Sequence, residues 1–143
     1  MSRTFIPVGL RRLVHERAAG RCEYCAIPET FSFAAHHIDH IVAEKHDGPT
    51  NPDNLALCCT LCNRYKGSDL TAIDPQTGNI VTLFDPRQDT WATHFNLPAD
   101  GTLRSDTPTG RATIRLLQLN RPERIEERRM LLLSGLWPQP TDG

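Results

Sequence analysis

Apolar residues near the start of the chain recur at intervals of three and four positions: Leu10, Leu13, Val14 and Ala18. This spacing is typical of one face of an amphipathic helix. It predicts a helix over residues 7–19, and Gly20 suits the position that follows a helix end. The charged residues of this segment are expected to lie on the solvent face.

Residues 21–67 have little helical periodicity and contain all of the cysteines. A β-compatible apolar stretch lies within residues 31–41, and the glycine and prolines of residues 48–52 indicate a loop. Residues 54–57 favour a second short strand, and residues 60–66 favour a short helix. The predicted order in this segment is therefore strand, loop, strand and helix.

A hairpin and two helices are predicted for the extension over residues 68–136. Proline and glycine mark a turn just before residues 80–84, which form the returning strand of the hairpin. One helix follows Thr107 and Pro108, which suit the N-cap and the first helical position. The other helix has Pro122 in its first turn.

Composition and charge limit the class of protein. The 143 residues suit one domain, and the chain is 38% hydrophobic and 23% charged. No apolar run approaches the ~20 residues of a membrane helix, and residues 1–7 lack the apolar core of a secretory signal. We therefore expect one cytoplasmic domain over residues 1–143, with no membrane partner and a flexible tail at residues 137–143. The formal net charge is −1, so a nucleic acid would have to bind to a local basic patch.

The five cysteines are the strongest chemical signal in the composition. An odd number of cysteines in a reducing compartment argues against a disulfide framework and favours metal binding. Cys22 and Cys25 form one Cys-x-x-Cys pair, and Cys59 and Cys62 form a second. Two such pairs supply the four thiolates of a closed structural zinc site, which is the favoured interpretation over a thiol redox pair. Cys58 is left over and is interpreted as a small buried residue.

Histidine, aspartate and asparagine lie between and beside the two cysteine pairs. Together with the cysteines they form a joint pattern: Cys22-Glu23-Tyr24-Cys25, Ile38-Asp39-His40-Ile41, Asn54-Leu55 and Cys59-Thr60-Leu61-Cys62-Asn63-Arg64-Tyr65-Lys66-Gly67. This pattern resembles the zinc-knuckled, stand-alone bacterial members of the HNH endonuclease family, the ββα-metal (His-Me finger) nucleases. The resemblance implies an α+β fold with a ββα-metal core over residues 22–67, stapled by a zinc site of four cysteines. The N-terminal helix precedes this core, and the hairpin and two helices follow it.

The resemblance also implies a chemistry, the metal-dependent hydrolysis of DNA phosphodiester bonds. It assigns His40 as the general base, and Asp39 and Asn63 as ligands of one catalytic Mg²⁺ or Mn²⁺ ion. It assigns Asn54 to orient the loop and the base. His37 is either a third metal ligand or phosphate contact, or a structural histidine. Neighbouring residues of a regular strand point to opposite faces, so we expect the strand to end or bulge at Asp39 and His40.

Basic side chains provide the expected contacts to DNA, which by analogy is double-stranded. They are Arg64 and Lys66 on the motif helix, and Arg111 and Arg115 at a spacing of four residues. The alternative function is a catalytically silent zinc module that binds nucleic acid or protein. Such a module needs the cysteines but has no need of the aspartate, histidine and asparagine together. Oligomeric state, sequence specificity and pathway stay open.

Overall fold

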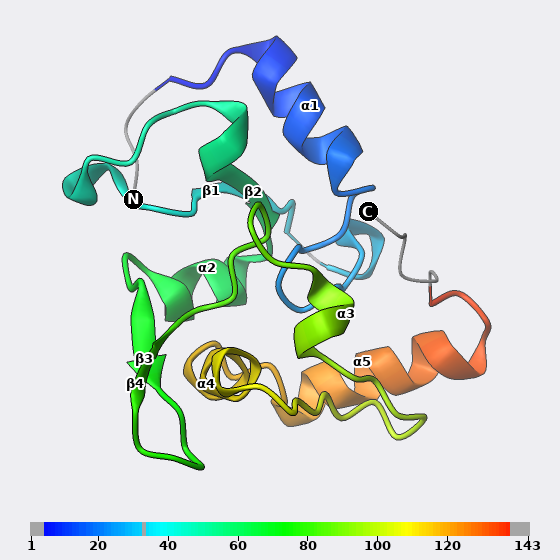
Figure 1. The fold of residues 1–143 in the computed structure, drawn as a ribbon. Coiled ribbons are helices and arrows are strands. Elements are labelled where there is room, and N and C mark those ends of the chain that lie inside the picture. The colour runs from blue at the N-terminus through cyan, green and yellow to red at the C-terminus, as the bar shows by residue number, and fades with distance from the viewer. Residues whose placement is uncertain (1–4, 33, 138–143) are drawn as a thin grey trace. The chain divides into compact units, whose positions relative to one another are not determined.

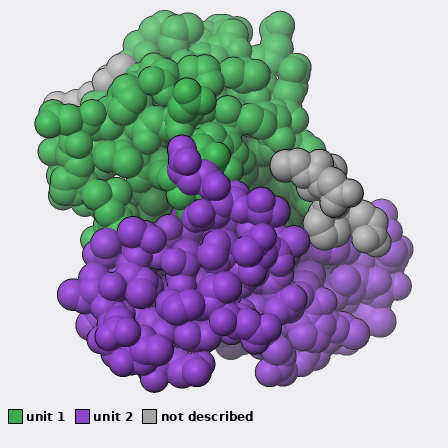
Figure 2. Space-filling view, viewed as in Figure 1, with its two compact units in different colours: residues 1–70, 85–87 green, residues 71–84, 88–143 purple. Residues whose placement is uncertain are grey.

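The chain divides into two compact units, which Figure 2 colours separately. The structure is a computed structural model, and it describes residues 5–32 and 34–137. The first unit comprises residues 1–70 and 85–87, and the second comprises residues 71–84 and 88–143. Of the expected tail, residues 138–143 lie outside the described part of the chain. Within the described part, none of the helices has the length and apolar character needed to cross a membrane.

The first unit contains the predicted order of strand, loop, strand and helix (Figure 1). Strand β1 (His37–His40) pairs antiparallel with β2 (Leu55–Cys58), and α2 (Thr60–Lys66) follows directly. The N-terminal helix is α1 (Val8–Arg17), close to its predicted range. The sulfur of Cys59 accepts a hydrogen bond from the backbone N–H of Cys62 and so caps the start of α2.

An apolar core joins α1 to the two strands. Its buried members are Val14, Ala18, Leu55 and Leu57, and the half-buried Leu10 and Ile38 pack against it. The helical pattern at the N-terminus therefore buries the face that the sequence predicts, except that Leu13 is exposed. Alternation along β1 places His37 and Asp39 on the face opposite to Ile38.

Residues 85–87 belong to the first unit because Arg87 binds it at two points. The guanidinium of Arg87 forms an ion pair with Glu23, and it donates a hydrogen bond to the carbonyl oxygen of Leu55 at 3.1 Å. The other carboxylate oxygen of Glu23 accepts a hydrogen bond from the backbone N–H of Leu57 at 2.8 Å. These contacts connect the first cysteine pair to the middle of β2.

The described part of the second unit contains a hairpin and three helices. The hairpin pairs β3 (Thr71–Ile73) with β4 (Ile80–Thr82), so the returning strand is shorter than predicted. The helices are α3 (Trp91–His94), α4 (Pro108–Leu116) and α5 (Pro122–Leu133). Helix α4 begins as predicted, with the side chain of Thr107 accepting a hydrogen bond from the N–H of Gly110 at 3.0 Å.

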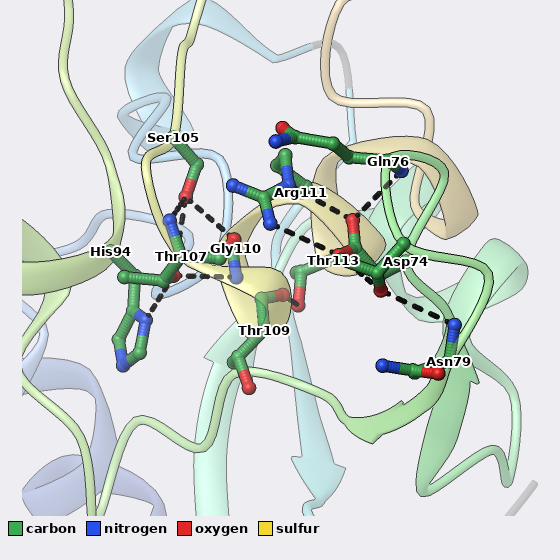
Figure 3. Close-up of polar contacts among 11 residues, drawn as sticks. Asp74, Gln76, Asn79, His94, Ser105, Thr107, Thr109, Gly110, Arg111 and Thr113 are labelled. Atoms are coloured by element: carbon green, nitrogen blue, oxygen red, sulfur yellow. Dashed lines mark hydrogen bonds and ion pairs between the residues drawn. The ribbon is translucent and has the colours of Figure 1, made fainter.

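A buried ion pair ties α4 to the end of β3 in this unit (Figure 3). Asp74 is fully buried, and Arg111 donates to both of its carboxylate oxygens, at 2.9 and 3.0 Å. Gln76 donates through its backbone N–H at 3.1 Å and Thr77 through its hydroxyl at 2.8 Å. The Arg111 guanidinium holds the pKa of Asp74 well below its usual range. The guanidinium of Arg111, predicted to contact DNA, is thus paired with Asp74 inside this unit.

Candidate metal and phosphodiester site

Four cysteines of the first unit form a cluster that is positioned to bind a metal ion. The sulfur atoms of Cys22, Cys25, Cys59 and Cys62 all lie within 4.8 Å of one another, and all four residues are buried. The sulfur atoms of Cys25 and Cys59 are 3.8 Å apart. Tetrahedral coordination with metal–sulfur bonds of ~2.3 Å requires sulfur atoms separated by ~3.8 Å. The cluster therefore has the dimensions of a tetrahedral thiolate site.

Burial makes uncompensated thiolates unfavourable at Cys22 and Cys25. Burial raises the pKa of the Cys22 and Cys25 thiols, so their thiolate forms need a compensating positive charge. No disulfide joins any of the five cysteines. Cys58 is buried beside the cluster but is not one of the four grouped sulfur atoms, which agrees with its interpretation as a small buried residue.

Asp39 lies near the end of β1 and is held by two donors. Its Oδ2 atom accepts a hydrogen bond from the hydroxyl of Tyr24 at 3.2 Å and lies 3.1 Å from Nζ of Lys66. Burial raises the pKa of Asp39, and the Lys66 ammonium acts in the opposite direction. Burial also raises the pKa of Tyr24, so its hydroxyl stays protonated and acts as the donor.

Lys66, predicted to contact DNA, is buried in this structure. Its side chain is 2% exposed, and its ammonium also donates to the carbonyl oxygens of Ile41 at 3.0 Å and His40 at 3.4 Å. Lys66 supplies the positive charge that balances Asp39.

His40 is the last residue of β1 and is almost fully buried. Its Nε2 atom lies 2.8 Å from Oγ1 of Thr50 and 3.4 Å from Oε1 of Glu44. The strand ends at His40, as the sequence predicts, and its pairing with β2 is one-to-one through His40 and Leu55. The pairing with β2 has no bulge at Asp39 or His40.

Asn54 closes the loop that follows β1. Its side-chain oxygen accepts from the N–H of Val42 at 2.9 Å, and its amide donates to the carbonyl oxygens of Val42 and Pro49 at 2.9 and 2.8 Å. Gly48 is required there, because a Cβ atom at this position would lie 1.7 Å from the oxygen of Val42. Among the described residues, none of these hydrogen bonds goes to His40, so Asn54 acts on the loop.

A cleft of about 880 Å³ in the first unit brings the predicted polar residues together. Its lining includes Asp39, His40 and Asn63, and also His37 and Arg64. Asn63 is half-buried on α2 and follows Cys62 of the metal cluster directly. His37 is exposed, and its Nε2 atom lies 3.2 Å from Oγ1 of Thr60. An acid, a histidine and an amide thus face one cavity beside the cysteine cluster.

The cysteine cluster and the residues Asp39, His40 and Asn63 of the cleft lie within a segment that matches a known family, whereas Ile6, Arg11 and His15 of the cleft lining precede it. Residues 22–69, about a third of the chain, match the family model of the HNH endonucleases. This segment is similar to HNH endonuclease domains and is called the HNH domain below. The resemblance seen in the sequence is therefore confirmed, as is the α+β fold of helices and small sheets. Searches of curated proteins and of solved structures found no match to the chain.

Sequence reasoning missed three contacts inside the HNH domain. Tyr24 holds Asp39, Lys66 balances it, and Thr50 lies against His40. Tyr24 stands between the first two cysteines, so the motif contains it without showing what its hydroxyl binds. Nothing in the sequence points to Thr50, because its contact depends on how the loop after β1 folds back.

The predicted DNA-contacting residues differ in how the structure places them. Arg64 is exposed on α2 and lines the cleft of the HNH domain, and Arg115 is exposed on α4 of the second unit. Lys66 and Arg111 are instead paired with carboxylates inside their own units. Arg64 thus has the placement that a phosphate contact requires.

Proposed function

We propose that this protein is a metal-dependent endonuclease that hydrolyses DNA phosphodiester bonds in the cleft of its HNH domain. The observation that carries the proposal is that Asp39, His40 and Asn63 line one cavity next to the cysteine cluster. The family match supports a nuclease acting on nucleic acid. A module that only binds nucleic acid or protein would have no need of these three residues in one cleft.

We further propose that the four-cysteine cluster holds a structural Zn²⁺ ion. Zinc prefers tetrahedral coordination by thiolates, and sites with four protein ligands are closed and structural. The cluster connects two segments far apart in sequence, since one pair precedes β1 and the other starts α2. The ion would therefore hold the two sides of the cleft in place.

His40 is assigned as the general base that removes a proton from the attacking water. Contacts with Thr50 and Glu44 orient the imidazole through Nε2. Among the described residues Nδ1 has no hydrogen-bond partner, so we assign the proton transfer to Nδ1. Asn54 supports this geometry by holding the loop that carries Glu44.

Asp39 and Asn63 are assigned to hold a catalytic Mg²⁺ or Mn²⁺ ion. The donor set fits a hard cation, because it offers a carboxylate oxygen and an amide oxygen at the wall of the cleft. The ion would neutralise charge on the phosphate oxygens. Two protein ligands make a weak site, so phosphate oxygens of the DNA would complete it. Substitution of His37 tests whether it adds a third ligand. Its imidazole lies at the cleft, but its Nε2 atom contacts the hydroxyl of Thr60.

Plasmid cleavage by the wild type and by His40→Ala tests the proposal. Wild-type protein should nick or linearise DNA with Mg²⁺ or Mn²⁺ and not with EDTA. His40→Ala should cleave roughly 10²–10⁴-fold more slowly, the usual worth of a positioned base. Its zinc content and DNA affinity should stay near those of the wild type. A wild type that binds DNA but cleaves with neither ion, or a variant as fast as the wild type, would favour the silent binding module.

A further inference from the structure

Tyr24 has a position that neither the metal cluster nor the proposed chemistry explains. It lies between Cys22 and Cys25, and its side chain is almost completely buried. Its hydroxyl is not directed to the cluster but donates to Oδ2 of Asp39 at 3.2 Å. A tyrosine buried for packing alone would have no need of this hydroxyl, since phenylalanine fills nearly the same volume.

The two donors that reach Asp39 both bind the same oxygen. Nζ of Lys66 lies 3.1 Å from Oδ2, the atom that the Tyr24 hydroxyl also contacts. The other oxygen, Oδ1, has no hydrogen-bond partner among the described residues. A carboxylate anchored through one oxygen has a restricted orientation and presents the second oxygen in a defined direction. Because Asp39 lines the cleft, Oδ1 is the atom available to a ligand there.

The cysteine cluster restricts the position of the Tyr24 hydroxyl. Cys22 and Cys25 both belong to the cluster, and the N–H of Cys25 lies 3.5 Å from the sulfur of Cys22 in a tight turn around Tyr24. The second cysteine pair has an equivalent relation to the cleft, since Asn63 follows Cys62. Both residues proposed to hold the divalent ion are thus tied to the cluster, one through its backbone and one through a hydrogen bond.

We propose that Tyr24 is a positioning residue for Asp39. Its hydroxyl, held in place by the turn between Cys22 and Cys25, anchors Oδ2 together with Lys66 and leaves Oδ1 as the oxygen that binds the divalent ion. The inference rests on the proposed function, because it assigns Asp39 to that ion. It makes the cysteine cluster a determinant of the affinity for the catalytic ion as well as of stability.

The Tyr24→Phe variant tests this inference, since it removes only the hydroxyl. Zinc-loaded protein is titrated with Mn²⁺, and free Mn²⁺ is measured by electron paramagnetic resonance. A DNA duplex is bound, and all proteins carry His40→Ala so that the duplex stays intact. Loss of a hydrogen bond to a ligating carboxylate should weaken Mn²⁺ binding roughly 10–100-fold. In proteins with His40 intact, Tyr24→Phe should need more Mn²⁺ for half-maximal cleavage and approach the wild-type rate at saturating Mn²⁺.

Tyr65→Phe is the matched control, because Tyr65 is the other tyrosine of the chain and does not line the cleft. It should leave the Mn²⁺ affinity unchanged. An unchanged Mn²⁺ affinity in Tyr24→Phe would overturn the inference. Loss of zinc or of the folded state in Tyr24→Phe would also overturn it, because the hydroxyl would then have a structural role.

Asp39→Asn separates this inference from the proposed function. If Asp39→Asn loses Mn²⁺ binding while Tyr24→Phe retains it, only the positioning role is wrong. If Asp39→Asn binds Mn²⁺ as tightly as the parent protein, the proposed metal site itself is wrong.

Discussion

Asp39 in the HNH domain and Asp74 in the second unit are both buried carboxylates paired with a basic side chain. Asp74 accepts four hydrogen bonds, two from Arg111 and one each from Gln76 and Thr77, and these are distributed over both oxygens. Asp39 accepts from Tyr24 and Lys66 through Oδ2 alone. Asp74 is thus saturated with donors, whereas Oδ1 of Asp39 has no hydrogen-bond partner among the described residues.

The electrostatic consequences of the two pairs are opposite. Arg111 holds the pKa of Asp74 below its usual range, whereas burial raises the pKa of Asp39 despite the nearby Lys66. A bidentate guanidinium matches a carboxylate and stabilises its charged form. The Lys66 ammonium, which also donates to two backbone carbonyl oxygens, stabilises the charged form of Asp39 less. The difference distinguishes a buried ion pair that stabilises a charged carboxylate from one in which burial outweighs the nearby positive charge.

Loss of the metal cluster should have the largest effect. Cys22→Ser or Cys62→Ser should lose the metal and unfold the HNH domain, because binding energy of ~10–16 kcal/mol for a structural zinc ion is folding energy. The metal content is measured by atomic absorption and the fold by circular dichroism. Cys58→Ser is the control and should keep both. A folded Cys22→Ser protein without metal would show that the cluster does not hold the domain together.

Replacement of Asp39, whose carboxylate accepts hydrogen bonds through one oxygen only, should abolish catalysis. Asp39→Asn should lower DNA cleavage by roughly 10³-fold or more, since charge stabilisation by a bound ion is worth several kcal/mol. Zinc content should be unchanged because Asp39 is not part of the cysteine cluster. The rate is measured on plasmid DNA with Mg²⁺ and with Mn²⁺. Cleavage within tenfold of the wild type would place Asp39 outside the reaction.

Replacement of Asp74, whose two carboxylate oxygens both accept hydrogen bonds, should lower stability instead. Asp74→Asn leaves Arg111 without its counter-charge and should lower the melting temperature of the second unit by about 10 °C. Both tryptophans of the chain, Trp91 and Trp137, lie in the second unit, so their fluorescence reports its unfolding. Cleavage by the folded protein at low temperature should match the wild type. A large loss of activity with unchanged stability would reverse the roles assigned to the two aspartates.

The stabilising effect of Asp74 should also depend on pH. Its pKa is depressed in the folded state, so the unfolded chain binds more protons once the pH falls below ~4. The stabilisation is therefore fully present above about pH 4 and decreases as the pH falls toward the folded-state pKa. Melting curves followed by tryptophan fluorescence should show the wild type and Asp74→Asn converging in acid. A constant difference across this range would contradict the assignment.

The smallest expected effect concerns DNA binding. Arg64→Ala should weaken binding evenly across DNA sequences and reduce the slope of log affinity against log salt by about 1, as loss of one phosphate contact does. Arg12→Ala, which removes an exposed arginine of α1 that does not line the cleft, is the control. Fluorescence anisotropy at several salt concentrations measures both. Equal slopes for the two variants would show that Arg64 makes no specific phosphate contact.

Local sequence signals determined the elements that carry the site. The cysteine spacing predicted the four-sulfur cluster, and the range predicted for the motif helix agrees with α2 (Thr60–Lys66). Thr107 and Pro108 marked the start of α4 because capping depends on neighbouring residues only. Helix α3 was not predicted, since four residues are too few to show a helical period.

Only the tertiary structure decided which side chains meet. Arg64 and Lys66 are two residues apart on one short helix, yet one lines the cleft in solvent and the other is buried against Asp39. Residues two apart lie on different sides of a helix, and composition does not show which side packs inward. Arg111 meets Asp74 across 37 positions, and Tyr24 meets Asp39 across 15. Such pairings depend on how distant segments pack, which local propensity and spacing do not encode.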